Sequence, residues 1–353
     1  MVKLYITFVI LTYKYRVKDK HSAALNRMAK GVNYVWNYCN DVQKHALKWD
    51  TKWPTGFDLS NKTAGSTLLL GLHAGTVNAV CEQYAQSRKQ HKKPFLRYRG
   101  EKSLGWIPLK GRGLRFNGDK FRFFRKDFSV WMSRNIPEGA SIRGGSGFSQ
   151  DSRGRWYLNV VVQTDAVSQK SGPAIGVDLG LKDLAVLSDG VKIKAPRIFR
   201  NSEKRLIAAQ SARKRRQVKK IHAKIFNQRR DFLHKVSTKM VRDYGHIVVG
   251  NVSSSKLAKT KMAKSVLDAG WSTLRNQLAY KSDHAGVTFQ VVNEAYSSQA
   301  CSECGSLGGP KGRQGLCIRE WQCVHCGASH DRDVNSARYI LRLGQETLIA
   351  GAA

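Results

Sequence analysis

The first part of the chain has a strand-like pattern that then changes to helical spacing. Residues 1–17 alternate or run apolar, which is typical of one strand. From residue 18 to residue 92, apolar side chains recur every three or four positions, as on one face of a helix. Trp53-Pro54-Thr55-Gly56 interrupts this spacing with turn residues. We therefore expect one strand followed by a helical segment.

Short strands and frequent turn residues characterise the next segment, residues 93–167. Asn117-Gly118 lies between two apolar runs and predicts a hairpin. Asp151-Ser152-Arg153-Gly154 predicts a second turn, just before an alternating strand that starts at Trp156. Together these strands predict a small antiparallel β-barrel that residues 1–17 complete, with the helical segment 18–92 inserted into it.

After a linker at about 168–173, buried strands alternate with helices. A long helix is predicted over roughly 201–242 and another over 264–284, between strands at 174–178, 184–187, 191–193, 246–250 and 287–292. Strand, hairpin, helix, strand, helix, strand is the order of an RNase H-like α/β fold. The whole chain is therefore predicted to be an α+β protein of several domains, although the order of elements says little about function.

Charge narrows the choice of partner. The 353 residues include 61 Lys and Arg against 25 Asp and Glu, so the formal net charge is 61 − 25 = +36. A chain this basic favours a polyanionic partner, with nucleic acid the first candidate and an anionic membrane surface the second. The apolar run from Leu4 to Tyr13 is about half as long as a membrane-spanning helix, and no cleavable leader is recognised. We expect no membrane partner and a cytoplasmic location.

Four of the seven cysteines form two pairs with metal-binding spacing. Cys301 and Cys304 make the first Cys-x-x-Cys pair, and Cys323 and Cys326 make the second, with 18 residues between the two pairs. Four thiolates satisfy tetrahedral Zn²⁺ and leave no open position, so the spacing predicts a structural zinc site. The alternatives are a redox site or two accidental pairs. Cys317 does not fit the spacing, and His325 is interpreted as a filler within the second knuckle.

Two acidic residues have positions that suggest a second metal. Asp178 ends an apolar strand, and Asp333 lies at the start of the last helix, just after the second cysteine pair. Converging carboxylates can hold a pair of Mg²⁺ ions, which activate water and stabilise the leaving oxygen in phosphodiester cleavage. Each residue has a simpler explanation, because Asp often ends strands and caps helices.

A basic run in the long predicted helix is the clearest candidate for nucleic-acid contact. Few acids interrupt it, so little pairing within the chain offsets its repulsion. A solvated charged face is the simpler alternative. The predicted contacts are Arg213, Lys214, Arg215, Arg216, Lys219, Lys220, Lys224, Arg229 and Arg230. Basic and aromatic residues also mix around Phe95 and Tyr98, where base stacking and ordinary sheet alternation explain the pattern equally well.

Three motifs resemble TnpB, the transposon-encoded OrfB family related to type V CRISPR effectors. They are Gly176-Val177-Asp178-Leu179-Gly180, the segment from Tyr296 to Gly305, and Asp331-Arg332-Asp333-Val334-Asn335 with the preceding Cys326-Gly327. The resemblance covers about 174–342, and the first half is similar only in architecture. It implies a wedge-type barrel and an RNA-guided DNA endonuclease with one RuvC-like site. The implied partners are a guide RNA made from the transposon end and double-stranded target DNA beside a short target-adjacent motif.

Transferring the family's acids residue by residue exposes a gap. Asp178 matches the first acid and Asp333 the third, whereas Asp331 lies outside the pattern. The second acid is expected at the end of the strand 246–250, where this chain has Gly250. We expect Glu294, at the end of the strand 287–292, to replace it as a magnesium ligand. The alternative is that Glu294 merely forms a salt bridge with a neighbouring Lys or Arg side chain.

The resemblance also implies a domain layout. The barrel comprises 1–17 and 93–167, the helical recognition insertion 18–92, the RuvC-like domain 168–300 and 328–353, and the zinc ribbon 301–327. The missing acid at Gly250 leaves open a nuclease-inactive RNA-guided DNA-binding regulator. A DNA-strand transferase of the RNase H type is a further alternative. A protein of this family is expected at the nucleoid of a bacterial or archaeal cell.

Overall fold

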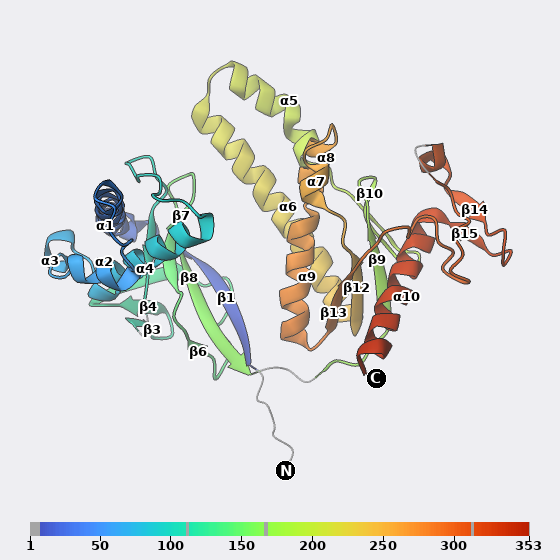
Figure 1. Cartoon of the computed structure of the whole chain (residues 1–353), viewed down its shortest axis with the longest axis horizontal. Helices are drawn as coiled ribbons and strands as arrows, with labels where there is room; N and C mark the ends of the chain where they lie inside the picture. The colour runs from blue at the N-terminus through green and yellow to red at the C-terminus, as the bar shows by residue number, and fades with distance from the viewer. Residues whose placement is uncertain (1–7, 111–112, 166–168, 312–313, 353) are drawn as a thin grey trace, which may run out of the picture. The chain divides into compact units, whose positions relative to one another are not determined.

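The computed structural model describes residues 8–110, 113–165, 169–311 and 314–352. Its contacts divide the chain into two compact units, Met1–Asp165 and Ala166–Ala353 (Figure 1). Residues 1–7 of the first predicted strand, and residues 166–168 at the predicted boundary between barrel and RuvC-like domain, lie outside the described residues.

The first unit is an antiparallel sheet with a helical insertion. The insertion separates β1 (Phe8–Val17) from the other strands and contains η1 (Asp19–His21), α1 (Ser22–Lys48), α2 (Gly56–Lys62), α3 (Thr67–Leu70) and α4 (Ala74–His91). The strands that follow are β2 (Trp106–Pro108), β3 (Leu114–Phe116), β4 (Lys120–Phe123), β5 (Lys126–Trp131), β6 (Ser141–Ile142), β7 (Gly147–Gln150) and β8 (Trp156–Asp165).

This sheet remains open where the sequence predicts a closed barrel. Its strand order is β2-β7-β8-β1-β5-β4-β3, with β6 also pairing with β8, and no pairing joins β2 to β3 within the described residues. Both edge strands have only three residues, so they offer few backbone groups for a further ladder. One core holds the sheet and the insertion together, with aromatic side chains from the strands, such as Tyr15, Phe121 and Trp156, packed with Leu25 and Val32 of α1.

The second unit has a five-stranded mixed sheet in the order β11-β10-β9-β12-β13. The strands β9 (Ala174–Leu179), β12 (His246–Gly250) and β13 (Thr288–Val292) are parallel, whereas β10 (Asp183–Leu187) and β11 (Lys192–Lys194) continue the sheet antiparallel. The remaining elements are α5 (Ile198–Ser211), α6 (Arg215–Asp243), α7 (Ser254–Leu257), α8 (Ala263–Ala269), α9 (Trp271–Ala285), η3 (Gln314–Cys317), β14 (Glu320–Gln322), β15 (Ser329–Asp331) and α10 (Arg332–Ala352).

Helices cover both faces of this sheet. Alternate residues of β9 and β12, including Val177 and Val249, face the core that Leu233 of α6 and Leu274 of α9 share. On the other face, β9 approaches α10 so closely that a side chain at Gly176 would begin 2.0 Å from the Ala337 carbonyl oxygen. Figure 1 shows α10 on one side of the strands and α6 with α9 on the other. The glycine of the Gly-Val-Asp motif therefore permits the contact that brings α10 beside Asp178.

Two predicted helices are each divided in the structure. The single helix expected over 201–242 is a hairpin of α5 and α6, held together by Leu206, Ala209, Ile221 and Ile225 (Figure 1). Arg213, in the turn between them, has the left-handed φ of 50°. The helix expected over 264–284 is likewise divided at Gly270, with φ of 70°, into α8 and α9. No helix within the described ranges combines the length and apolar character needed to cross a membrane.

Candidate functional site

The candidate acidic site lies where the parallel strands of the second sheet end. Val177 of β9 is opposite Val249 of β12, and Gly250 of β12 is opposite Val292 of β13. Asp178 and Gly250 therefore lie at the same level of the sheet, at the carboxyl ends of neighbouring strands. Open α/β sheets bind their ligands at this edge. Glu294 follows the end of β13 by two residues, so its backbone reaches the same edge.

The Glu294 carboxylate occupies the space that a side chain at position 250 would need. A Cβ atom built on Gly250 would lie 2.1 Å from Glu294 Oε2 and 3.1 Å from Glu294 Cβ. The Glu294 amide is 3.4 Å from Asn251 Oδ1, to which it donates a hydrogen bond. The Glu294 carboxylate can therefore take this position only because residue 250 is a glycine.

Asp333 is held at the start of α10 by its neighbours. Asp331 caps this helix, since its Oδ1 accepts hydrogen bonds from the amides of Asp333 and Val334, both at 3.0 Å. Asp331 also pairs with Lys192 at 2.6 Å. Asp333 itself forms an ion pair with Arg319, at 3.0 Å. Helix capping therefore accounts for the position of Asp331. Asp333 is paired with the Arg319 guanidinium, which a bound metal ion would displace.

The acids influence one another electrostatically. Burial, followed by the negative charges of Glu294 and Asp333, raises the pKa of Asp178 to about 7, and the positive charge of Arg332 opposes this rise. Burial also raises the pKa of Glu294. The Oε2 atom of Glu294 is buried and has no hydrogen-bond partner among the described residues. A divalent cation fits this arrangement, because it would bind an unpartnered carboxylate oxygen and reduce the mutual repulsion.

The three acids stay too far apart to form a closed ligand shell. In the described part of the chain, only one group of three or more His, Cys, Asp or Glu residues has all its ligand atoms within 4.8 Å of one another, and it consists of cysteines. Asp178, Glu294 and Asp333 are nevertheless near enough for the charges of the other two to raise the pKa of Asp178. A metal ion bound by all three would have to bring their carboxylates closer together.

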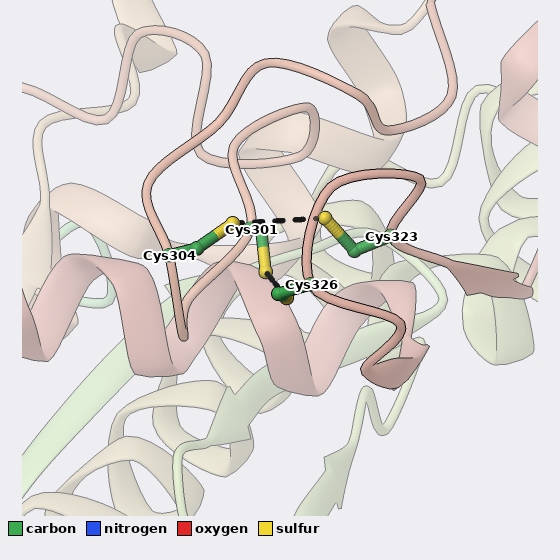
Figure 2. A group of neighbouring side chains, drawn as sticks. All are labelled: Cys301, Cys304, Cys323 and Cys326. Atoms are coloured by element: carbon green, nitrogen blue, oxygen red, sulfur yellow. Dashed lines mark hydrogen bonds between the residues drawn. The ribbon is translucent and has the colours of Figure 1, made fainter.

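That cysteine group is the set predicted from the two pairs. Cys301, Cys304, Cys323 and Cys326 converge on one point (Figure 2). The sulfur atoms of Cys301 and Cys326 are 3.6 Å apart, and those of Cys304 and Cys323 are 3.7 Å apart. Four converging sulfur atoms form the ligand set of a structural zinc site, so the prediction of a four-cysteine cluster is confirmed.

Both pairs have the same backbone turn. Gly305 donates its amide hydrogen to the Cys301 carbonyl at 2.9 Å, and Gly327 donates to the Cys323 carbonyl at 2.8 Å. Both glycines have left-handed φ angles, of 80° and 74°. Hydrogen bonds, first the one from the Ser306 hydroxyl and then those from the Cys326 and His325 backbone, lower the pKa of Cys323 to about 5. Each turn thus directs its two thiols toward the centre of the cluster. The Ser306 hydroxyl favours the thiolate form of Cys323, which is the form that binds metal.

Two residues of this region have roles that the motif spacing did not reveal. His330 on β15 places its Nε2 atom 3.1 Å from Cys301 Sγ. Asn335 on α10 is buried, accepts a hydrogen bond from the Ser302 amide at 2.8 Å and donates one to the Ala300 carbonyl at 2.7 Å. Asn335 therefore ties the first cysteine turn to the helix that carries Asp333. Its place in the Asp333-Val334-Asn335 motif was the only signal for it in the sequence.

The predicted nucleic-acid residues divide into two groups. Arg229 forms an ion pair at 2.9 Å with the buried Asp268, which also accepts a hydrogen bond from the Phe199 amide at the start of α5. Arg230 is half-buried, and its Nε donates to His234. The other seven are exposed around the turn and the first part of α6, namely Arg213, Lys214, Arg215, Arg216, Lys219, Lys220 and Lys224. These seven present their charge to solvent.

Comparisons with known proteins agree with the motifs. A Cas12f1-like TNB domain family matches residues 271–340, and a probable transposase family matches residues 157–261. A putative RNA-guided DNA endonuclease of Streptomyces pristinaespiralis is 38% identical over 230 residues, which are 61% of this chain and 56% of that protein. The putative RNA-guided DNA endonuclease InsQ of Escherichia coli is 29% identical over 294 residues, 75% of this chain and 71% of that protein.

The fold is also shared with a solved structure. The protein chain in the cryo-EM structure of a Cas12f1-sgRNA-target DNA complex has a TM-score of 0.59 and 13% sequence identity. The match covers 92% of this chain and 83% of that one. The region similar to the Streptomyces relative spans little more than half of that relative's length. The resemblance to the TnpB family is therefore confirmed, and the chain is related to TnpB proteins and has a Cas12f1-like fold.

Proposed function

We propose that this protein is an RNA-guided DNA endonuclease that cleaves at one RuvC-like site, formed at the strand ends of the second unit. The observation that carries the proposal is the Glu294 carboxylate in the space of a side chain at Gly250. In this proposal Glu294, from the segment after β13, supplies the acid that is missing at the end of β12, where the chain has Gly250. Relatives named as RNA-guided DNA endonucleases support the same activity.

Asp178, Glu294 and Asp333 would hold Mg²⁺ in this proposal. Bound magnesium would supply an activated water and stabilise the leaving oxygen of the cleaved phosphodiester. The chain's own contribution is to place three carboxylates from β9, the segment after β13 and α10 at one edge of the sheet. Asp178 must lose its proton to act as a ligand, because burial and neighbouring charges raise its pKa. Asp333 must exchange its ion pair with Arg319 for the metal.

The four cysteines would hold a structural Zn²⁺ that fixes the ribbon to α10. All four thiolates would be occupied, so the ion would have no open position for chemistry. Asn335 bridges the first cysteine turn and α10, two positions after Asp333. The ion would therefore stabilise the helix end that carries one of the acids.

The large positive charge suits a guide RNA and duplex DNA. The seven exposed cations at the α5–α6 turn would contact phosphate groups, and a net charge of +36 would be offset by a bound RNA. We propose a guide RNA made from the transposon end. Base pairing would select the DNA beside a short target-adjacent motif that the protein reads.

One observation favours a second candidate, a nuclease-inactive RNA-guided regulator. Gly250 removes the acid that the family places at this strand end, and the three remaining acids do not form a compact metal-binding group among the described residues. In this alternative the protein would bind the target DNA and leave it intact. The two candidates share RNA and DNA binding and differ only in cleavage.

The two candidates are separated by guided cleavage. The full chain is co-expressed with RNA from the flanking transposon end, purified as a complex and given matching plasmid with Mg²⁺. We expect plasmid cutting that Asp178→Ala and Glu294→Ala slow by roughly a hundred-fold or more and that Glu346→Ala retains, because Glu346 pairs with Arg342 on the surface of α10. Specific plasmid binding without any cutting by the unmodified complex would establish the regulator instead.

A further inference from the structure

The segment that links α4 to β2 has no regular secondary structure, yet α1 holds its backbone in place. We name residues 95–102 the strap. Asn37 donates to the Arg99 carbonyl at 2.9 Å and accepts from the Arg99 amide at 2.8 Å. Asn40 donates to the Leu96 carbonyl at 2.7 Å and accepts from the Leu96 amide at 2.9 Å. Two side-chain amides on one helix thus pair with the strap as a neighbouring strand would.

Further bonds fix the same geometry. The Tyr84 hydroxyl donates to Asn40 Oδ1 at 2.7 Å, within the core of the first unit. Trp36 Nε1 donates to the Arg97 carbonyl at 3.2 Å, and Arg99 Nε donates to Asn33 Oδ1 at 2.7 Å. The strap is therefore preorganised, so a ligand would not have to bear the entropic cost of ordering it.

The fixed backbone presents aromatic and basic side chains outward. Phe95 and Tyr98 remain 47% and 41% exposed. The Lys44 ammonium lies 4.5 Å from the centre of the Tyr98 ring and 5.2 Å from that of Phe95. Residues 91–102 carry one acid, Glu101, against the cations Lys92, Lys93, Arg97, Arg99 and Lys102. Exposed rings beside cations are the composition of a surface that stacks bases and contacts phosphates.

A cavity adjoins this surface. It has a volume of about 560 Å³, and residues 96–100 and Lys102 of the strap line it together with Trp36, Ser87 and His91. Asp41 is the acid of α1 beside the strap, and it accepts a hydrogen bond from the Tyr98 hydroxyl. That bond directs the hydroxyl of Tyr98 toward the helix and leaves part of its ring accessible.

We propose that the strap binds an unpaired stretch of the guide RNA. Bases would stack on Phe95 and Tyr98, and Lys44, Arg97 and Lys102 would contact the adjacent phosphates. Folded RNA offers unstacked bases in loops and bulges, whereas target DNA arrives with its bases paired. This inference rests on the proposed function, since that function makes RNA the resident partner. It adds a defined RNA-binding element on the first unit, which lacks the acidic site.

Binding to short probes tests the stacking. The full chain is titrated with a labelled 15-nucleotide oligouridylate RNA and with a 15-base-pair DNA duplex at one salt concentration. We expect the Phe95→Ala/Tyr98→Ala variant to bind the RNA roughly ten-fold or more weakly, and the duplex within about two-fold of the unmodified chain. Phe57→Ala is the matched control, because Phe57 on α2 is 73% exposed and lies outside the strap.

A Phe95→Trp/Tyr98→Trp variant is the control that separates lost stacking from lost stability. It keeps stacking surfaces and should retain most of the RNA affinity, with a melting temperature near that of the alanine variant. RNA affinity that is unchanged in the alanine variant, or a loss that the duplex shares equally, would overturn the proposal.

Cross-linking in the purified complex identifies the occupant. Irradiation of the chain with its co-expressed RNA, before any DNA is added, should attach RNA to the peptide that carries Phe95 and Tyr98. A cross-link that forms only after target DNA is added would assign the strap to DNA and contradict the proposal. A chain that purifies with no RNA would refute the proposed function itself, whereas RNA binding and cutting unaffected by the strap variants would refute only the strap.

Discussion

The second unit has two clusters of candidate metal ligands, and they differ in how they are assembled. The four cysteines come from two short turns, each closed by its own backbone hydrogen bonds, and their sulfur atoms converge on one point. The three acids come from β9, the segment after β13 and α10, which only tertiary packing brings together. They repel one another and stay apart. The cysteine cluster is thus built locally, whereas the proposed acidic site depends on tertiary packing and on release of the ion pair between Arg319 and Asp333.

The largest effect is expected at the cysteine cluster. Cys323→Ala should lose the bound zinc and the protection of ribbon amides from hydrogen exchange, because structural zinc supplies about 10–16 kcal/mol in small zinc domains. Cys317→Ala is the matched control, since Cys317 is exposed and lies outside the cluster. One zinc per chain by metal analysis is expected for the unmodified protein and this control. Full amide protection in the Cys323 variant would contradict a structural role.

Loss of one acid should stop cleavage and leave the fold intact. Asp178→Asn keeps the size of the side chain and removes its charge, so guided plasmid cutting should fall roughly a thousand-fold, as expected when several kcal/mol of metal stabilisation are lost. Asp183→Asn, on the neighbouring strand β10, should cut at nearly the normal rate. Normal cutting by the Asp178 variant would remove this residue from the acidic site.

The raised pKa of Asp178 should make both protein stability and magnesium binding depend on pH. Because the folded pKa of Asp178 is about 7, above its ordinary value of 3.8, the fold without magnesium binds an extra proton between these values. With zinc retained on the cysteines, the stability of the magnesium-free protein should therefore fall as pH rises from about 4 to about 7. Over the same window ionisation favours Mg²⁺, so the half-saturating magnesium concentration should rise as pH drops below 7.

A denaturation series without magnesium, on the zinc-loaded protein, measures that slope, and Asp178→Asn should flatten it. Magnesium titrations of cleavage at pH 6 and pH 8 provide the second measurement. A half-saturating concentration that is equal at both pH values would show that Asp178 does not limit metal binding.

The smallest effect is expected at the ion pair between Arg319 and Asp333. Arg319→Ala frees the carboxylate, and the pair is partly exposed, so its removal should tighten magnesium binding by about five-fold or less. Arg319→Lys should keep much of the pairing and behave as the unmodified chain does. Weaker magnesium binding in the alanine variant would show that Arg319 supports the site and does not compete for it.

The cysteine cluster could be predicted from the sequence because its geometry is local. Two residues between paired cysteines and a glycine after each pair are enough to specify the turn. The contact of His330 with Cys301 could not be predicted in this way, since a single histidine on a short strand has no distinctive spacing. The role of Asn335 depends on the packing of α10 against the ribbon, which the sequence pattern does not encode.

Periodicity located the strands of the second sheet and only part of the first sheet, where β5 and β7 went unpredicted, and it failed at two helix boundaries. Apolar spacing continues from Leu206 to Ile225 with no glycine or proline between them, so the turn at Arg213 left no signal. The open edge of the first sheet was also missed, because strand patterns report burial and not which strands pair. The place of Glu294 followed from the resemblance and from the scarcity of acids in a chain with only 25.

The central claim is that Glu294 supplies the carboxylate that Gly250 lacks. It is tested most directly by moving the acid back, with guided plasmid cleavage compared in Glu294→Gly and in Gly250→Glu/Glu294→Gly. The first variant should cut roughly a hundred-fold more slowly, because one metal ligand is lost. The second removes the side chain that would clash with a Cβ at position 250 and should recover at least ten-fold of that loss. Normal cutting by Glu294→Gly would contradict the claim.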